Sequence, residues 1–183
     1  MISVLIPIAQ GVEEMEAVII VDIFRRAGWK VLIAGLDENV VIASRGVRLL
    51  PDCAWDAVVS SDFDAIVLPG GTNGTEALRK DKRVLEAVKS FHQSGRLIGA
   101  ICAAPLVLHE AGILSHRKIT SHPSAAAKLT GTEWLDTAVV TDGNIVTGQG
   151  AGTSFKFALA MVRLAGDGAA AEQIARAINL AAE

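Results

Sequence analysis

Apolar runs of strand length alternate with amphipathic segments of helix length along the whole chain. The short runs are rich in Val, Ile and Leu, which is typical of parallel strands covered on both faces. They predict strands at Ser3–Ile8, Lys30–Gly35, Asp64–Leu68, Leu97–Ile101, Ala138–Thr141 and Asn144–Thr147. The helical periodicity predicts helices at Glu14–Ala27, Lys82–Ser94, Ala103–Ala111, Ser124–Leu129, Thr153–Ala165 and Gly168–Ala181. This alternation indicates a doubly wound α/β fold.

Glycines follow three of the predicted helices at positions where helix C-terminal caps belong. They are Gly28, Gly95 and Gly112. The imperfect alternation over Val40–Leu50 predicts a short hairpin. No linker, repeat or low-complexity tract interrupts the pattern, so we expect a single domain over residues 1–183.

Composition and charge narrow the class of protein. Apolar residues make up 51% of the chain, enough for one sizeable core, and the formal net charge is −3. The basic residues are scattered except for one cluster, Arg79, Lys80, Lys82 and Arg83, which contains Asp81 and sits at a predicted helix boundary. A solvated surface explains this cluster better than a nucleic-acid track, so we expect no specific nucleic-acid binding.

The N-terminal segment reads as a first strand and lacks the basic leader of a secretory signal. No apolar stretch approaches the roughly 18 residues of a membrane span. We therefore expect a cytoplasmic protein without membrane association. In that compartment Cys53 and Cys102 are expected to be free thiols.

Three segments follow predicted strands and should meet at one edge of the sheet, where open parallel sheets bind ligands. They are Gly11–Glu16, Pro69–Gly74 and Cys102–Pro105. Cys102 lies at an abrupt change from strand to helix, the setting of a nucleophile elbow. A helix N-terminus favours the thiolate but contributes at most about 2 kcal/mol, so we expect a second group to assist.

A buried carboxyl group that keeps its proton is a suitable second group. Glu13, Glu14 and Glu16 are the candidates, and the alternative for each is the ordinary preference of acidic residues for a first helical turn. The backbone amides of Gly70, Gly71 and Ala103 are candidates for holding an oxyanion, although a tight turn would also explain the glycines.

Other candidates carry weaker signals. His122 lies in the turn-like Thr120-Ser-His-Pro123 and is a candidate base or polarising group. Cys53 has no cationic or helix-start context and is expected to be structural. The glycines of Gly148–Thr153 lack the full spacing of a nucleotide site. No set of residues has metal-ligand spacing, and we expect no cofactor and no metal.

Several ordered motifs resemble the DJ-1/ThiJ/PfpI superfamily, in its DJ-1 subgroup. They are Gly11-Val-Glu-Glu-Met-Glu16-Ala, Val21-Asp-Ile-Phe-Arg-Arg-Ala-Gly28, Val67-Leu-Pro-Gly-Gly71, Ala100-Ile-Cys-Ala-Ala-Pro105, Thr120-Ser-His-Pro123 and Gly152-Thr-Ser-Phe-Lys-Phe-Ala158. The resemblance implies a flavodoxin-like, class I glutamine amidotransferase-like three-layer sandwich with a mostly parallel central sheet. It also implies a homodimer.

The resemblance further implies Cys102 as the oxidation-sensitive nucleophile, Glu16 as its protonated partner and His122 nearby. Gly71 and Ala103 would supply amides at the site. Glu13 and Arg45 match positions near the dimer interface, and Arg26 matches a position close to the site, where it would bind substrate.

The implied activity is a cofactor-independent glyoxalase-type lyase or deglycase-type hydrolase, with a role in carbonyl and oxidative stress. Its substrates would be methylglyoxal, glyoxal or glycated protein and nucleotide groups. The alternative is a redox sensor or chaperone whose cysteine is oxidised without turnover. Ala104 and Ala151 depart from the residues common in relatives, so pocket shape is expected to differ. Ala103 stands where protease-like relatives carry His, which counts against a peptidase.

Overall fold

The computed structural model describes residues 1–180, and its centre is a seven-stranded sheet. The strands are β1 (Ser3–Ile8), β2 (Lys30–Gly35), β5 (Cys53–Ala54), β6 (Ala65–Leu68), β7 (Leu97–Ile101), β10 (Val139–Asp142) and β11 (Ile145–Gly148). Their order is β10-β11-β7-β6-β1-β2-β5, and every neighbouring pair is parallel except β10 with β11. The carboxyl ends of β1, β6 and β7 therefore share one edge of the sheet.

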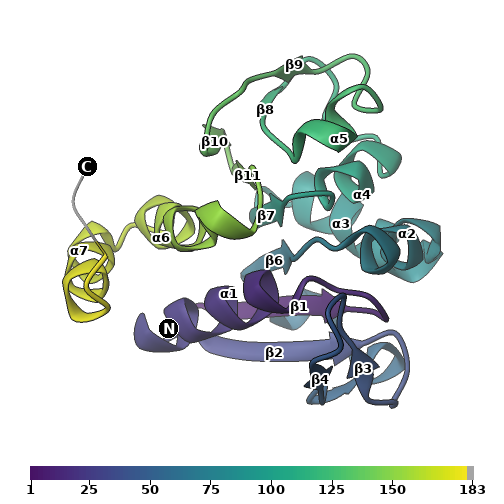
Figure 1. Cartoon of the computed structure of the whole chain (residues 1–183), viewed down its shortest axis with the longest axis horizontal. Coiled ribbons are helices and arrows are strands. Elements are labelled where there is room, and N and C mark those ends of the chain that lie inside the picture. Colours follow the sequence, from purple (N-terminus) through teal and green to yellow (C-terminus); the bar gives the residue numbers. More distant parts are fainter. Residues whose placement is uncertain (181–183) are drawn as a thin grey trace.

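Helices cover both faces of the sheet and enclose one apolar layer on each side. One layer packs against α2 (Thr72–Lys80), α3 (Lys82–Gln93) and α4 (Pro105–Glu110). The other packs against α1 (Glu14–Arg26), α6 (Ser154–Leu164) and α7 (Gly168–Ala177). In Figure 1 the yellow-green helices α6 and α7 lie apart from the teal group of α2, α3 and α4. The arrangement confirms the expected flavodoxin-like three-layer sandwich.

Smaller elements complete the chain. The hairpin predicted within Val40–Leu50 forms from β3 (Val41–Ile42) and β4 (Arg48–Leu49), which pair antiparallel. A second small sheet pairs β8 (Lys118–Ile119) with β9 (Glu133–Trp134), and the helix α5 (Pro123–Ala126) lies between them in sequence. Short 3-10 turns are η1 (Trp55–Ala57), η2 (Ser60–Asp62) and η3 (Ala151–Thr153).

All the strands and helices predicted from periodicity form, with ends that move by a few residues. The last predicted helix ends at Ala177, and Ala181 lies outside the described residues. Gly28, Gly95 and Gly112 take positive φ after their helices, as expected of C-terminal caps.

The helix α2 was not predicted, because Thr, Asn and Gly in its first turn are weak helix formers. It forms against the sheet by burying Thr75 and Leu78. The basic cluster around it forms surface ion pairs: Arg79 contacts Glu76 and Glu110, and Arg83 contacts Asp81 and Asp56. Within residues 1–180, no helix is long and apolar enough to cross a bilayer.

Candidate functional site

The three segments that follow β1, β6 and β7 meet at the carboxyl edge of the sheet, as the strand pattern predicts. The N–H of Glu13 donates to the carbonyl of Gly70 over 3.0 Å, which joins the first segment to the second. A side chain on Gly70 would lie 2.7 Å from Cβ of Cys102 and 2.8 Å from Oε2 of Glu16. Gly70 therefore lies next to both the thiol and the carboxyl group, and because it has no side chain the two groups can lie close together.

Cys102 occupies a strained turn between β7 and α4. Its φ is +62°, in the left-handed region that non-glycine residues seldom adopt. Its N–H donates to Gly148 O over 2.9 Å, and its carbonyl accepts from the N–H of His122 over 2.8 Å. Backbone hydrogen bonds on both sides hold the turn in this conformation. The geometry is that of a nucleophile elbow, which presents a side chain at the edge of the sheet.

Glu16 is a fully buried carboxyl group in the first turn of α1. The N–H of Gly70 donates to its Oε2 over 2.6 Å, whereas Oε1 has no hydrogen-bond partner among the described residues. Burial raises the pKa of Glu16 to about 7, against the lowering effect of the Gly70 N–H. The unpartnered oxygen is thus the natural position for a proton, and a neutral Glu16 can donate it to a neighbour.

Burial and the nearby Glu16 carboxylate raise the pKa of Cys102 to about 12, while the amides of Gly71 and Ala103 lower it. Burial outweighs the help expected from a helix N-terminus, since α4 begins only at Pro105 and the Ala103 amide offsets only part of the rise in the pKa of Cys102. Protonation of Glu16 removes the repulsion between the two negative charges. Ionisation of Cys102 and protonation of Glu16 therefore favour each other, and the two groups titrate as a pair.

Gly71 lies beside the same site in a conformation that needs glycine. Its φ is +90°, and a side chain there would collide with the backbone of Gly11 and of Val12–Glu13. This close approach is what brings the Gly71 amide next to the sulfur, where that of Ala103 also lies. The two amides expected to hold an oxyanion are therefore both beside Cys102.

The remaining two glutamates bind the loop that carries Arg45. Ser44 donates its hydroxyl toward Oε2 of Glu13 at 2.6 Å and Oε2 of Glu14 at 2.7 Å. The N–H of Arg45 donates to Oε1 of Glu14 over 2.8 Å. Burial alone would raise the pKa of Glu14, but its hydrogen bonds outweigh burial and the net shift is downward. Glu14 therefore organises a loop, and the structure leaves Glu16 as the carboxyl group beside Cys102.

The sequence pattern does not predict a role for Ser44, because nothing near it in the chain marks it. Its partners lie about 30 positions earlier, on the other side of β2. A serine in a loop has many possible roles, and only the docking of the loop on α1 assigns it this one.

His122 joins the site through its backbone, and its exposed side chain bonds to Ser124. A side chain on Gly150 would lie 3.7 Å from Cδ2 of the His122 ring. The ring therefore lies near the loop after β11, whose Gly148 carbonyl accepts from Cys102.

Arg26 is not brought to the site within one chain, contrary to the expectation. It lies ten positions after Glu16 on the same helix, about 15 Å along the axis. Its side chain is exposed and pairs with Asp22 at 2.6 Å. The rigid length of α1 carries the two residues to opposite ends.

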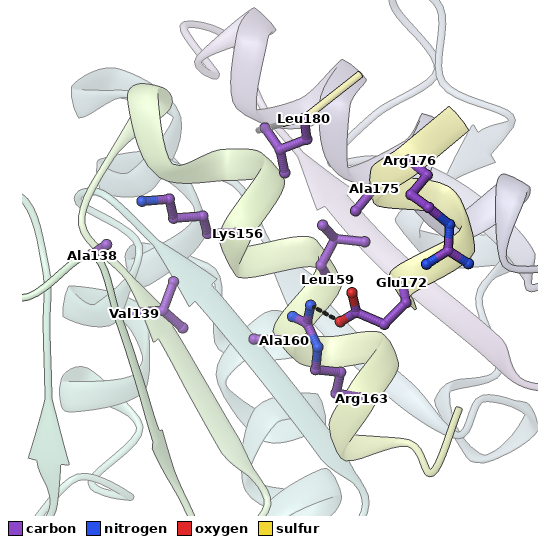
Figure 2. Close-up of a pocket in the computed structure, with 10 residues that line it drawn as sticks. All are labelled: Ala138, Val139, Lys156, Leu159, Ala160, Arg163, Glu172, Ala175, Arg176 and Leu180. Carbon is purple, nitrogen blue, oxygen red and sulfur yellow. Dashed lines mark hydrogen bonds and ion pairs between the residues drawn. The ribbon is translucent and has the colours of Figure 1, made fainter. Parts of the chain in front are cut away.

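Two other features lie away from this centre. Cys53 is in β5, and burial raises its pKa, which agrees with a structural thiol. A hollow of about 580 Å³ lies between β10, α6 and α7, with Arg163 paired to Glu172 in its wall (Figure 2). None of the residues around Cys102 lines it. Among residues 1–180, no cluster of three or more His, Cys, Asp or Glu is placed to hold a metal ion.

The sequence is similar to those of several known proteins. Protein DJ-1 homolog B of Arabidopsis thaliana is 42% identical over 162 residues, which cover 87% of this chain and 37% of the plant protein. This chain thus spans little more than a third of that relative. Glutathione-independent glyoxalase DJR-1.2 of Caenorhabditis elegans is 39% identical over 155 residues, covering 84% of this chain and 82% of the relative.

A solved structure of a relative has the same fold. The crystal structure of Drosophila melanogaster DJ-1beta superposes with a TM-score of 0.93 at 41% identity, and 98% of each chain is covered. Residues 2–164 match the DJ-1/PfpI family. With the elbow cysteine, the buried glutamate and the paired amides in place, the chain belongs to the DJ-1/PfpI family.

Proposed function

We propose that this protein is a cofactor-independent glyoxalase or deglycase that converts methylglyoxal, glyoxal or their adducts to hydroxy acids. One observation carries the proposal: the strained Cys102 lies beside the buried carboxyl group of Glu16, whose Oε1 has no partner among the described residues. A nucleophile beside a proton carrier is the pair of groups that an internal redox isomerisation needs.

The reaction begins when the Cys102 thiolate attacks the aldehyde carbon of methylglyoxal. A C–S bond forms and the carbonyl becomes an oxyanion, toward which the amides of Gly71 and Ala103 are directed. Protonation of that oxygen gives a hemithioacetal. Glu16 supplies the proton in this step and becomes a carboxylate.

The carboxylate of Glu16 then removes the proton from the former aldehyde carbon and returns one to the adjacent ketone carbon, while the hydroxyl proton on the first carbon's oxygen passes to the former ketone oxygen. The first carbon is oxidised to a thioester and the second is reduced to an alcohol, so no external oxidant or reductant is required. Water hydrolyses the thioester, releasing lactate and restoring the thiol. In a glycated amine or nucleotide, the thiolate attacks the hemiaminal carbon, the C–N bond breaks and the amine leaves with a proton from Glu16. The resulting hemithioacetal enters the same sequence.

The named activity of the Caenorhabditis elegans relative, a glutathione-independent glyoxalase, supports this proposal. The test is lactate formation from methylglyoxal by protein freed of metal and glutathione. We expect repeated turnover in the wild type and none in Cys102→Ser. Cys53→Ser is the matched control, since it removes the other thiol, which lies in β5, and should leave turnover unchanged.

Lactate formation by Cys102→Ser at the wild-type rate would refute the thiol mechanism. Absence of turnover in the wild type, together with peroxide oxidation confined to Cys102, would instead favour the redox sensor or chaperone.

A homodimer is the second part of the proposal, and an exposed apolar face supports it. Met15 and Val18 on α1 and Leu50 after β4 are 54%, 51% and 72% exposed. Val18 and Leu50 line an apolar groove of about 240 Å³ formed by α1, β1, β2 and β4. Side chains of this size are seldom gathered on the surface of a monomer. Glu13 and Arg45 lie on the loops that border this face.

Sedimentation of the wild type should give twice the chain mass, and Val18→Glu should give the mass of one chain. Val59→Glu is the matched control, because Val59 is 58% exposed but lies near η2, away from the groove. A monomeric wild type would refute the proposed dimer.

A further inference from the structure

The ring of His122 caps a helix, which is an uncommon use of histidine. His122 is the N-cap residue of α5, a position usually held by Ser, Thr, Asp or Asn. The backbone N–H of Ser124 donates to its Nδ1 at 3.3 Å, and the hydroxyl of Ser124 lies 2.8 Å from the same nitrogen. Both donors therefore come from one residue.

These contacts decide which ring nitrogen carries the proton. A backbone N–H can only donate, so Nδ1 must offer its lone pair, and the Ser124 hydroxyl donates to it as well. In a neutral imidazole the other nitrogen, Nε2, then holds the hydrogen. Within residues 1–180, Nε2 has no hydrogen-bond partner, so this N–H is available to a ligand.

The position of the ring places this donor beside the elbow. The N–H of His122 donates to the carbonyl of Cys102, and Gly148 O accepts from the Cys102 N–H. The ring carbon Cδ2, which is bonded to Nε2, lies near Gly150, two residues after Gly148 at the end of β11. The free N–H thus belongs to the edge of the ring near Gly150, two residues beyond the β11 residue that accepts from Cys102.

We infer that Ser124 is a positioning residue that holds His122 as the Nε2–H tautomer, so that His122 acts as a hydrogen-bond donor to a substrate oxygen and not as a base. This choice between base and donor rests on the proposed glyoxalase function for its kinetic consequence. The tautomer of His122 does not depend on the proposed function, because it is a property of the free protein. A donor at this position would stabilise negative charge on the ketone oxygen of the bound substrate while Glu16 moves the proton between carbons.

Two nearly isosteric variants test the inference. Asn at position 124 retains an N–H donor for Nδ1, whereas the carboxylate of Asp can only accept a hydrogen. Ser124→Asn should therefore keep the Nε2–H tautomer, with kcat reduced by less than about tenfold, the effect of one altered hydrogen bond. In Ser124→Asp the carboxylate competes with the retained backbone N–H of residue 124 for the ring. By drawing a proton onto Nδ1 it should lower kcat at least tenfold below the Asn variant.

Nitrogen-15 NMR of the histidine rings at about pH 8 reads the tautomer directly, above the ordinary histidine pKa of about 6.5. His122→Gln identifies the His122 signals by their loss. His109 is an internal reference, since its Nε2 lies 2.9 Å from the Thr130 carbonyl and must carry hydrogen to bond to it. Its signals should be the same in all variants.

A protonated Nδ1 on His122 in the wild type would overturn the inference. Equal kcat values and equal ring spectra in the Asp and Asn variants would overturn it as well. If the wild type converts no methylglyoxal, the proposed function and the donor role both fail, while the ring spectrum still decides whether Ser124 fixes the tautomer.

Discussion

Replacement of Glu16 by Gln should change how the free energy of unfolding depends on pH. Burial raises the pKa of this carboxyl group from 4.5 to about 7 in the folded protein. Below about pH 4.5 both folded and unfolded chains keep the proton, so Glu16 imposes no penalty. Between about pH 4.5 and 7 the unfolded chain ionises while the folded chain does not, which stabilises the unfolded state.

The penalty is complete above about pH 7, where the difference between the two pKa values corresponds to about 3 kcal/mol. Gln cannot ionise, and its carbonyl oxygen can still accept from the N–H of Gly70. The stability of Glu16→Gln relative to wild type should therefore rise by about 3 kcal/mol between about pH 4.5 and 8.

Urea unfolding of both proteins at several pH values measures this difference, since titrating groups that do not interact with Glu16 cancel between them. Glu14→Gln is the matched control with the opposite sign. Hydrogen bonds lower the pKa of Glu14, so its carboxylate stabilises the fold above about pH 4.5 and this stability is lost as the pH falls. A Glu16→Gln difference that does not vary with pH would refute the assignment of a raised pKa to Glu16.

Three further changes test the packing around the site. Gly70→Ala adds a methyl group 2.7 Å from Cβ of Cys102, and the resulting displacement of the Cys102 side chain should lower kcat/KM for methylglyoxal about a hundredfold. Wild-type activity in this variant would contradict the prediction. The free energy of unfolding measured in urea should be about 1 kcal/mol higher for Cys102→Gly than for Cys102→Ala, because glycine tolerates a φ of +62°. The reverse order would argue against the strained elbow. Phe157→Ala should cost about 3–5 kcal/mol of unfolding free energy, since Phe157 is fully buried beneath the sheet, and a loss below about 1 kcal/mol would mean that the core there is loose.

Several parts of the fold could be read from neighbouring residues alone. The Val, Ile and Leu runs of β1, β2 and β7 predict their bounds to the residue, because each is an apolar run of strand length with polar or turn-forming residues next to it. The glycines after α1, α3 and α4 mark the helix ends for a similarly local reason, the left-handed φ of the cap. The place of Cys102 at a sharp turn follows from the same kind of pattern.

Contacts between distant segments decided the rest. Three glutamates share the stretch after β1 and are equivalent by local pattern, but Ser44 engages Glu13 and Glu14, whereas Glu16 alone lies buried beside Gly70. The helix α2 forms against its local propensity because the sheet buries Leu78.

The sequence by itself determined the α/β class, the order of the elements and the thiol at the carboxyl edge of the sheet, since these depend on periodicity and on turn chemistry. Tertiary structure decided which carboxyl group faces Cys102, that Arg26 is held at the far end of α1, and that His122 offers Nδ1 to Ser124. Those outcomes depend on burial and on distances between segments far apart in the chain, and a local pattern contains neither.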